Sequence, residues 1–169
     1  MIAIAAVDNN WAIGKSGRLL FHIKEDMLRF RNTTMGNICV MGRKTLESFP
    51  GGRPLEGRDN VVLTRDKNYS KKGVITATDI EDMMEKTRQL LLESPGKEVF
   101  LIGGDSVYAQ LIDECSAAYI TKVDYNYEAD AYFPKLDGRE GWELIDESEE
   151  NTSFDLAYTY TVYRNNLVR

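Results

Sequence analysis

The feature that most constrains the fold is an alternation of strand-like and helix-like segments along most of the chain. Runs rich in Val, Ile, Tyr and Phe predict strands at 2–7, 37–41, 59–64, 73–76, 98–102, 117–123, 142–146 and 154–164. Apolar residues at helical spacing predict helices over 24–34, 43–49, 79–93 and 105–114. Because strand and helix alternate, we expect right-handed crossovers and a mainly parallel sheet that is covered on both faces.

The alternation stops near the C-terminus, where FDLAYTYTVY has the pattern of an antiparallel strand. One side of this strand would carry Phe154, Leu156, Tyr158, Tyr160 and Val162, and the opposite side would carry smaller or polar residues. The pattern therefore predicts an α/β fold with a central mixed, mainly parallel sheet of about eight strands, an antiparallel C-terminal strand and about four flanking helices. The chain has no internal repeat and no long linker, so we expect residues 1–169 to form a single domain.

Composition and charge narrow the classes of function. The net charge of −6 argues against a nucleic-acid partner, because a phosphate backbone is bound by neutralisation. No apolar run approaches the roughly 18 residues of a membrane span, and MIAIAAVD lacks a basic leader, so we expect a soluble, cytoplasmic protein with no membrane partner. The single histidine, His22, excludes a multi-histidine metal site. Cys39 and Cys115 are expected to be reduced core residues, so no metal is predicted.

Three segments that follow predicted strands carry groups suited to anions. IGG at 102–104 opens a helix, and the free N–H groups of a helix start favour a phosphate. MGRKTLES at 41–48 brings two cations and a hydroxyl to another helix start, where they repel one another unless an anion is bound. VVLTRD at 61–66 ends in a hydroxyl and a guanidinium that could hold the additional phosphate of NADP. Each segment alone is also compatible with an ordinary turn, and the spacing excludes a P-loop.

A carboxylate interrupts an apolar helix face in LLFHIKEDMLRF at 19–30. If the helix begins at Lys24, the spacing of a buried face is followed by Ile23, Met27 and Phe30. Asp26 falls between them. It could stabilise the helix N-terminus, although Glu25 can already do so, or it could be a functional acid. A buried charge would need a cationic or multi-donor partner. The pattern leaves both interpretations open.

Taken in order, these segments resemble dihydrofolate reductase. The resemblance runs from about residue 2 to residue 134 through AAVDNNWAIGKSGRLLFHIKEDMLRF, MGRKTLES, GRPLEGRDNVVLTR, VFLIGGDSVYAQLI and YITKVDYNYEADAYFP. No single piece is decisive, but their ordered combination is specific. The resemblance implies an oxidoreductase of one-carbon metabolism that reduces 7,8-dihydrofolate to 5,6,7,8-tetrahydrofolate with NADPH. It also implies antifolate inhibitors as ligands, a monomer and a cytoplasmic location.

The resemblance implies a substrate site with two catalytic positions. Asp26 matches the carboxylate that grips the amino-pyrimidine edge of the pterin, and Thr121 matches the threonine that supports this carboxylate. Arg58 matches the arginine that pairs with the glutamate α-carboxylate of the substrate, with Arg53 near the same end. The other implied substrate contacts are Ile4, Ala6, Met27, Phe30, Phe49 and Ile102.

The implied cofactor site has three parts, and a mobile loop from Gly14 to Leu20 is expected to close over the first of them. Contacts to the nicotinamide are implied for Ala6, Ile13 and Gly14. A pyrophosphate cradle is implied for Arg43, Lys44, Thr45, Gly104, Asp105, Ser106 and Val107, and the adenosine 2′-phosphate site for Thr64 and Arg65. Further contacts to the cofactor are implied for Leu19, Gly42, Leu63, Ile102, Gly103 and Tyr108. The resemblance further implies a cis peptide bond between Gly103 and Gly104.

The chain departs from the family pattern at three places. Phe21 stands where Trp is usual, which removes an indole N–H. Lys24 and Leu20 each replace a common proline, and the turn FPGGRP is one or two residues longer than in short bacterial forms. Two rival functions remain distinguishable. A nucleotide-binding module without chemistry has no use for Asp26, and a reductase of another pterin or of a riboflavin-pathway pyrimidine has no use for Arg58.

Overall fold

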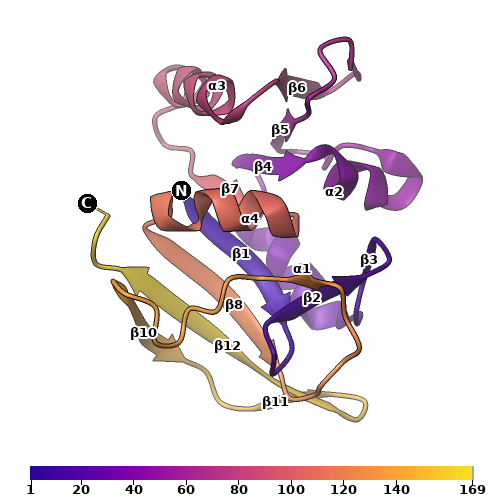
Figure 1. Cartoon of the computed structure of the whole chain (residues 1–169), viewed down its shortest axis with the longest axis vertical. Helices are drawn as coiled ribbons and strands as arrows, with labels where there is room; N and C mark the ends of the chain where they lie inside the picture. The colour runs from indigo at the N-terminus through magenta and orange to yellow at the C-terminus, as the bar shows by residue number, and fades with distance from the viewer. Residues whose placement is uncertain (169) are drawn as a thin grey trace.

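The computed structural model describes residues 1–168 (Figure 1). The strands of its main sheet are β1 (Ile2–Val7), β4 (Ile38–Gly42), β5 (Asp59–Leu63), β6 (Val74–Ala77), β7 (Val99–Leu101), β8 (Ala117–Val123), β10 (Trp142–Glu147), β11 (Asn151–Ser153) and β12 (Leu156–Asn165). The helices are α1 (Lys24–Thr34), α2 (Arg43–Ser48), α3 (Ile80–Glu93) and α4 (Asp105–Leu111), with 3₁₀ turns at Pro50–Gly52 and Ile112–Glu114. The strand order is β10-β12-β8-β1-β7-β4-β5-β6, with β11 paired to β12.

The main sheet confirms the predicted fold class. Its central strands pair in parallel, whereas β12 runs antiparallel to both β8 and β10. A second sheet was not predicted. It consists of β2 (Ala12–Lys15), β3 (Arg18–Leu19) and β9 (Ala131–Tyr132) in the order β3-β2-β9. Strands of two to four residues carry too little alternation to be recognised in a sequence.

The helices cover opposite faces of the main sheet. α1 and α2 connect strands that advance toward β6, whereas α3 and α4 connect strands that return toward β8, so right-handed crossovers place the two pairs on different faces. Figure 1 shows α4 in front of β1 and β8, with α1 behind them. Residues of β4 alternate accordingly. Val40 packs in the core cluster that contains Leu111 of α4, and Met41 packs with Leu46 of α2.

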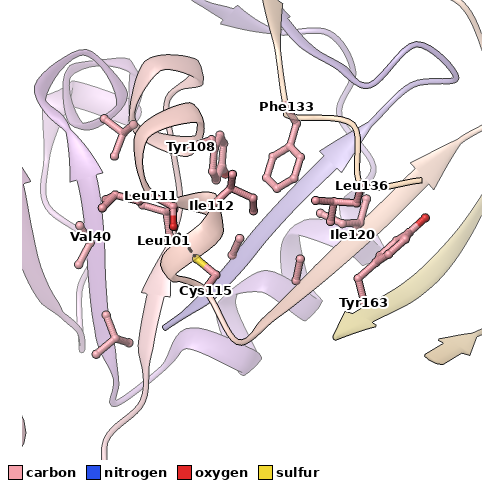
Figure 2. Packing of buried hydrophobic residues seen from close by; sticks show 14 of the residues in the cluster. Val40, Leu101, Tyr108, Leu111, Ile112, Cys115, Ile120, Phe133, Leu136 and Tyr163 are labelled. Atoms are coloured by element: carbon pink, nitrogen blue, oxygen red, sulfur yellow. Dashed lines mark hydrogen bonds between the residues drawn. The ribbon is translucent and has the colours of Figure 1, made fainter. Parts of the chain in front are cut away.

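The larger core lies between the sheet and helices α3 and α4 (Figure 2). Leu111 and Ile112 are 1% and 0% exposed, and each such side chain contributes about 1.5–3 kcal/mol by leaving water. The rings of Tyr108 and Phe133 pack with their centroids 4.6 Å apart. Cys115 is buried and unpaired in this cluster, as predicted. Cys39 is likewise buried and unpaired on the other face.

The C-terminal strand differs from its prediction in two respects. Phe154 does not belong to the strand, because it lies in the turn between β11 and β12 with a φ of 53° and a fully exposed side chain. The side opposite Tyr158 is also not simply small or polar, since Tyr163 is 1% exposed in the larger core. β12 is therefore covered on both faces over part of its length, and it extends to Asn165.

The segment expected as a mobile loop contains a β-hairpin formed by β2 and β3. Gly14 is required there, because a Cβ at this position would lie 2.9 Å from the carbonyl oxygen of Arg18. The hairpin is tied to the segment before β9, since Asp130 accepts a hydrogen bond from the Ser16 amide and donates its own amide to Gly14. Asp8, just after β1, accepts hydrogen bonds from three amides, those of Asn10, Ala12 and Tyr127. These contacts order the loops that follow β1 and β8.

Candidate active site

A carboxylate of α1 meets a hydroxyl of β8. The Thr121 hydroxyl donates a hydrogen bond of 2.6 Å to Asp26 Oδ1. Thr121 is buried, and its strand neighbours are Ala6 of β1 and Tyr160 of β12. Burial raises the pKa of the Asp26 carboxyl above its usual value, whereas the Thr121 hydrogen bond and the positive charge of Arg29 act in the opposite direction. Asp26 is thus a partly buried acid with a donor, rather than only a charge at a helix start.

The helix face around Asp26 is less buried than its spacing predicts. Ile23 is 2% exposed, but Met27 is 51% exposed and Phe30 is only half-buried. The expectation of a buried face was therefore wrong for Met27. The physical reason is that neither Met27 nor Phe30 belongs to a core cluster of the sheet. Apolar side chains beside a carboxylate are thereby left uncovered by the protein itself.

The carbonyl ends of β1 and β7 lie next to this acid in the topology. The pairing of β1 with β7 ends at Ala3 and Leu101, so Ile4 and Ile102 lie just beyond the last pair. The side chains of Ile4, Phe49 and Ile102 pack against one core cluster. The Tyr108 hydroxyl donates a hydrogen bond of 2.7 Å to the Ile4 carbonyl. Residues that were predicted for the substrate site from three separate segments thus pack against the same cluster.

Arg58 lies at the far end of α1 from Asp26. Its guanidinium donates to Thr34 Oγ1 at 3.2 Å and to the carbonyl of Glu56 at 3.0 Å. Asn60 fixes the loop, because its side chain bonds both backbone groups of Leu55 and the carbonyl of Arg58. Among residues 1–168 no carboxylate forms an ion pair with Arg58, and partial burial lowers its pKa.

Helix α1 sets the separation between Asp26 and the Arg58 guanidinium. Asp26 and Thr34 are eight residues apart on α1, which corresponds to about 12 Å along the helix axis. Thr34 is the residue that holds the Arg58 guanidinium. An acid and an unpaired cation therefore stand at opposite ends of a partly exposed apolar helix face. Arg53, predicted for the same end as Arg58, is exposed.

The ends of β4 and β7 approach each other closely at glycines. The Gly42 amide donates to the Gly103 carbonyl at 2.9 Å, and a Cβ on Gly42 would lie 3.2 Å from Cγ2 of Val107. A Cβ on Gly104 would lie 3.3 Å from the hydroxyl oxygen of Thr45. The Gly103–Gly104 peptide bond is cis, as the resemblance implies. This edge joins the starts of α2 and α4 and exposes Lys44, Asp105 and Ser106.

The cations near this edge are arranged differently from the expectation. Arg43 was expected to need a bound anion, but its guanidinium pairs with Glu47 at 2.7 Å and Asp66 at 3.4 Å and lies 4.3 Å from the ring centroid of Tyr69. The protein itself therefore compensates the Arg43 charge. The Thr64 hydroxyl accepts from the Asp66 amide, and Arg65 is exposed. Arg43 thereby lies beside the segment predicted for a 2′-phosphate.

The remaining predicted cofactor positions lie in different parts of the molecule. Leu19, on the hairpin, is 65% exposed. Ile13 and Leu63 pack against the larger core, and Tyr108 is buried within it. The Tyr108 hydroxyl connects that core with the β1 end of the site through its hydrogen bond to the Ile4 carbonyl.

Phe21, at the position of the usual Trp, packs against Tyr127 with the ring centroids 5.5 Å apart. It contacts the small cluster of Ile23, Val123 and Tyr158. The sequence reasoning did not identify Arg29 and Tyr160, whose side chains contact each other near Asp26. The three-residue spacing from Asp26 to Arg29 was the available signal.

Residues 1–168 contain neither a metal-binding cluster nor a membrane-spanning helix. No group of three or more His, Cys, Asp or Glu side chains is placed to hold a metal ion. Within the same range, the helices are all too short or too polar to cross a membrane.

The comparisons with known proteins agree with one another. A family model described as dihydrofolate reductase matches residues 1–165. The dihydrofolate reductase of Neisseria gonorrhoeae is 35% identical over 161 residues, which cover 95% of this chain and 94% of the relative. That of Bacillus subtilis is 34% identical over 149 residues, covering 88% and 83%.

A solved structure extends this likeness to the fold. Dihydrofolate reductase from Enterococcus faecalis, complexed with NADP(H) and RAB-propyl, superposes with a TM-score of 0.80 at 32% identity and covers 98% of this chain and 95% of that one. The fold and site thus define an α/β oxidoreductase. Within that class, the chain belongs to the dihydrofolate reductase family.

Proposed function

We propose that this chain carries out the reaction of its family at the edge formed by β1, β4, β7 and α1. The reaction is the reduction of 7,8-dihydrofolate to 5,6,7,8-tetrahydrofolate with NADPH. The observation that carries the assignment of residues is the Thr121–Asp26 hydrogen bond at one end of α1, combined with an unpaired Arg58 guanidinium at the other. A substrate with an amino-pyrimidine at one end and a carboxylate at the other suits both groups.

Asp26 and Thr121 are the proposed groups for the reacting ring. An ionised Asp26 accepts two parallel N–H bonds from an amino-pyrimidine edge, and Thr121 fixes the carboxylate through Oδ1. Met27, Phe30 and Phe49 supply apolar contacts, and Ala6, Ile4 and Ile102 line the strand ends. Arg58, with Arg53, binds the glutamate α-carboxylate. The exposure of Met27 in the free protein supports this role, because a ligand would cover it.

The residues at the ends of β4 and β7, where Gly42 and Gly104 lie, fit a dinucleotide. Gly42 and Gly104 leave space that a Cβ would fill, and the Thr45 hydroxyl is directed to the same place. We assign the pyrophosphate to the edge between Gly42 and Tyr108, the 2′-phosphate to Thr64, Arg65 and Arg43, and the nicotinamide to Ala6, Ile13, Gly14 and Leu19. NADPH supplies the hydride when it is bound. Arg43 would contribute by releasing its carboxylate partners Glu47 and Asp66 and binding the phosphate, since carboxylate and phosphate oxygens both accept hydrogen bonds from the planar guanidinium.

The chemical role of the chain is to orient and polarise the substrate ring. Hydride addition to a C=N bond requires a proton on the neighbouring ring nitrogen, and a carboxylate in a poorly solvated site favours the protonated or polarised ring. Asp26 lies at the amino-pyrimidine edge in this assignment, away from that nitrogen. It therefore acts as the orienting and electrostatic partner, while water delivers the proton. The hairpin of β2 and β3 is proposed to exclude bulk water as it closes.

The decisive assay is oxidation of NADPH by the purified chain with dihydrofolate as the substrate. We expect turnover with NADPH to exceed turnover with NADH, because Thr64 and Arg65 select the 2′-phosphate. Arg58→Leu should raise KM for dihydrofolate much more than it lowers kcat. A reductase that served a substrate without a glutamate tail would show no such increase, and a binding module would not oxidise NADPH.

The remaining assignments are proposals of the same kind. They comprise a single domain over residues 1–169, a monomer, a cytoplasmic location, antifolates as inhibitors, and no nucleic-acid or membrane partner. The acidic net charge of −6 supports the absence of a polyanionic partner. Sedimentation of the purified chain tests the monomer, and a dimer at micromolar concentration would contradict it.

A further inference from the structure

Arg29 lies beside Asp26 on α1. The two residues are three positions apart, which makes them neighbours on the helix surface. Among residues 1–168 no carboxylate lies within ion-pair distance of Arg29. Its guanidinium carbon instead lies 3.7 Å from the ring centroid of Tyr160, within the range of a cation–π contact. The ring holds the Arg29 charge in place without neutralising it.

Tyr160 is itself fixed next to the partner of Asp26. β12 pairs antiparallel with β8, and Tyr160 lies directly opposite Thr121 in that pairing. Thr121 donates its hydroxyl to Asp26 Oδ1 at 2.6 Å. A chain of contacts therefore runs from Asp26 through Thr121 and Tyr160 to Arg29, and it joins one helix to two neighbouring strands.

We propose that Arg29 is a positioning residue for Asp26: the Tyr160 ring fixes the guanidinium on the Asp26 side of α1, where its positive charge favours the ionised carboxylate. The inference rests on the role of Asp26 in the proposed function. An Arg side chain that serves only solubility keeps its rotamer freedom in water, whereas stacking on a ring gives up part of that freedom. The cation–π contact offsets part of this cost, and attraction to Asp26 adds a second favourable interaction in the stacked position.

The charges around Asp26 agree with this assignment. The elements packed around Asp26 carry these other titratable or charged groups: Lys24, Glu25, Arg29 and Arg31 on α1, Tyr119 and Lys122 on β8, and Tyr158, Tyr160, Tyr163 and Arg164 on β12. Of these, Arg29 and Tyr160 interact electrostatically with Asp26. Burial raises the pKa of Tyr119, and that of Tyr160 to about 12, so these two hydroxyls stay uncharged near neutral pH. Burial is also the largest influence on the pKa of Asp26 and raises it, while Arg29 lowers it. Arg29 is the positive charge that opposes the cost of burying the carboxylate.

The test follows the ionisation of Asp26 directly in the ligand-free protein. The ¹³Cγ resonance of Asp26, assigned with Asp26→Asn, is titrated in the wild type and in four variants. Arg29→Met should raise the pKa of Asp26 by about 0.5 pH unit at low ionic strength, and by less in concentrated salt, since the guanidinium is partly exposed. Tyr160→Leu removes the ring and should raise it in the same direction by a smaller amount.

Two matched variants serve as controls. Tyr160→Phe keeps the aromatic face, so Asp26 should titrate as in the wild type. Arg31→Met removes the same charge from α1 at a position about 200° around the helix from Arg29, and should change the titration least. Thermal melts establish that each variant is folded, and Arg29→Met tests the charge even if Tyr160→Leu does not fold.

The outcomes separate this inference from the proposed function. An Asp26 titration that is unchanged in Arg29→Met would overturn the inference, and so would a folded Tyr160→Leu variant that titrates like the wild type. These measurements need no substrate. If the wild type failed to oxidise NADPH with dihydrofolate, the proposed function would fail, whatever the titrations show.

Discussion

Helices α1 and α4 are both crossover connections on the same sheet, yet they are covered very differently. α4 has seven residues, of which Val107, Tyr108 and Leu111 are buried. α1 has eleven residues, of which only Thr34 is buried. Met27 and Leu28 on α1 are 51% and 55% exposed, whereas Leu111 on α4 is 1% exposed. One helix is held by the core, and the other presents an apolar surface and an acid that the protein leaves partly open.

The polar groups on the two faces differ in the same way. On the α4 face the Tyr108 hydroxyl is bonded to a backbone carbonyl, and burial raises its pKa so that it stays neutral. On the α1 face Asp26 keeps unused acceptor capacity, and within the described residues 1–168 Arg58 has no carboxylate partner. A face whose groups are satisfied internally stabilises the fold, and a face that is left incomplete can bind a ligand. The predictions below test this division, beginning with the largest effect.

The largest effect is expected on the incomplete face, for activity. Asp26→Asn should retain the fold and NADPH binding but lower hydride transfer at neutral pH by about 10²- to 10³-fold, or roughly 3–4 kcal/mol, because the amide cannot stabilise a protonated ring. Activity should recover partly in acid, where the substrate is protonated without help. Single-turnover oxidation of NADPH measures this.

Glu25→Gln is the matched control for that change. It removes a neighbouring carboxylate of the same first helical turn, which is exposed. Hydride transfer should remain within about twofold of the wild type, since surface charges contribute little. Turnover of Asp26→Asn equal to that of Glu25→Gln would remove Asp26 from the mechanism and end the functional contrast between the two helices.

The next effect is expected on the covered face, for stability. Leu111→Ala removes a buried side chain and should lower the free energy of unfolding by about 3 kcal/mol, through lost burial and the cavity that remains. Leu28→Ala, at a half-exposed position of α1, should change it by about 0.5 kcal/mol or less. Urea unfolding of both variants gives the comparison. Equal losses would show that α1 is packed as tightly as α4.

Much of the fold was predictable, because periodicity reports which residues face the core. All four helices and the eight strands of the central order were predicted to within two residues at nearly every boundary. The short strands of the second sheet were missed because they have no sequence pattern of their own. They are defined by pairing with distant residues, as between Gly14 and Ala131. Phe154 was wrongly assigned to the strand because an aromatic residue in the preceding turn extends the same alternating pattern, so the sequence alone does not distinguish the two positions.

The residues of the candidate site could be proposed from the sequence, but their arrangement could not. Asp26 and Thr121 are 95 positions apart, so no local spacing could show that they share a hydrogen bond. The same limit applies to Arg29 and Tyr160, which meet only because β12 returns next to β8. Arg43 illustrates the same limit, because its carboxylate partner Asp66 lies 23 positions away, so the local sequence could not show that the protein itself compensates the Arg43 charge.

A smaller effect tests the hydroxyl that joins the incomplete face to the sheet. Thr121→Val keeps the shape of the side chain but removes the donor to Asp26, and should lower kcat/KM for dihydrofolate by about tenfold, or roughly 1.4 kcal/mol. Thr161→Val is the control, because the Thr161 hydroxyl makes a similar 2.6 Å bond to the Ile120 carbonyl beside the larger core. It should lower stability with kcat/KM unchanged. An equal loss of kcat/KM in both variants would indicate a general structural effect.

The smallest effect concerns the stability that the incomplete face gives up. The pKa of Asp26 is raised by burial above 3.8, its ordinary value, so at neutral pH the folded protein bears the cost of an ionised, partly buried carboxylate. Asp26→Asn removes this charge and should raise the free energy of unfolding by about 1 kcal/mol at neutral pH. As the pH falls through the folded-state pKa, the wild-type carboxyl is protonated in the folded state first. The wild type should therefore gain stability relative to the variant. The difference in the free energy of unfolding should be lost once the pH is below the pKa of Asp26 in the unfolded state.

Urea unfolding across this pH range measures the difference, and Glu25→Gln again provides the contrast. Glu25 is exposed in the first turn of α1, where its negative charge interacts favourably with the positive end of the helix dipole. Its removal should therefore lower the free energy of unfolding at neutral pH by about 0.3–1 kcal/mol. The two neighbouring acids should thus change stability in opposite directions. A loss of stability in Asp26→Asn at neutral pH would mean that Asp26 serves the fold in the way Glu25 does. In that case α1 and α4 would differ in how much of each helix is buried, but not in what their polar groups do.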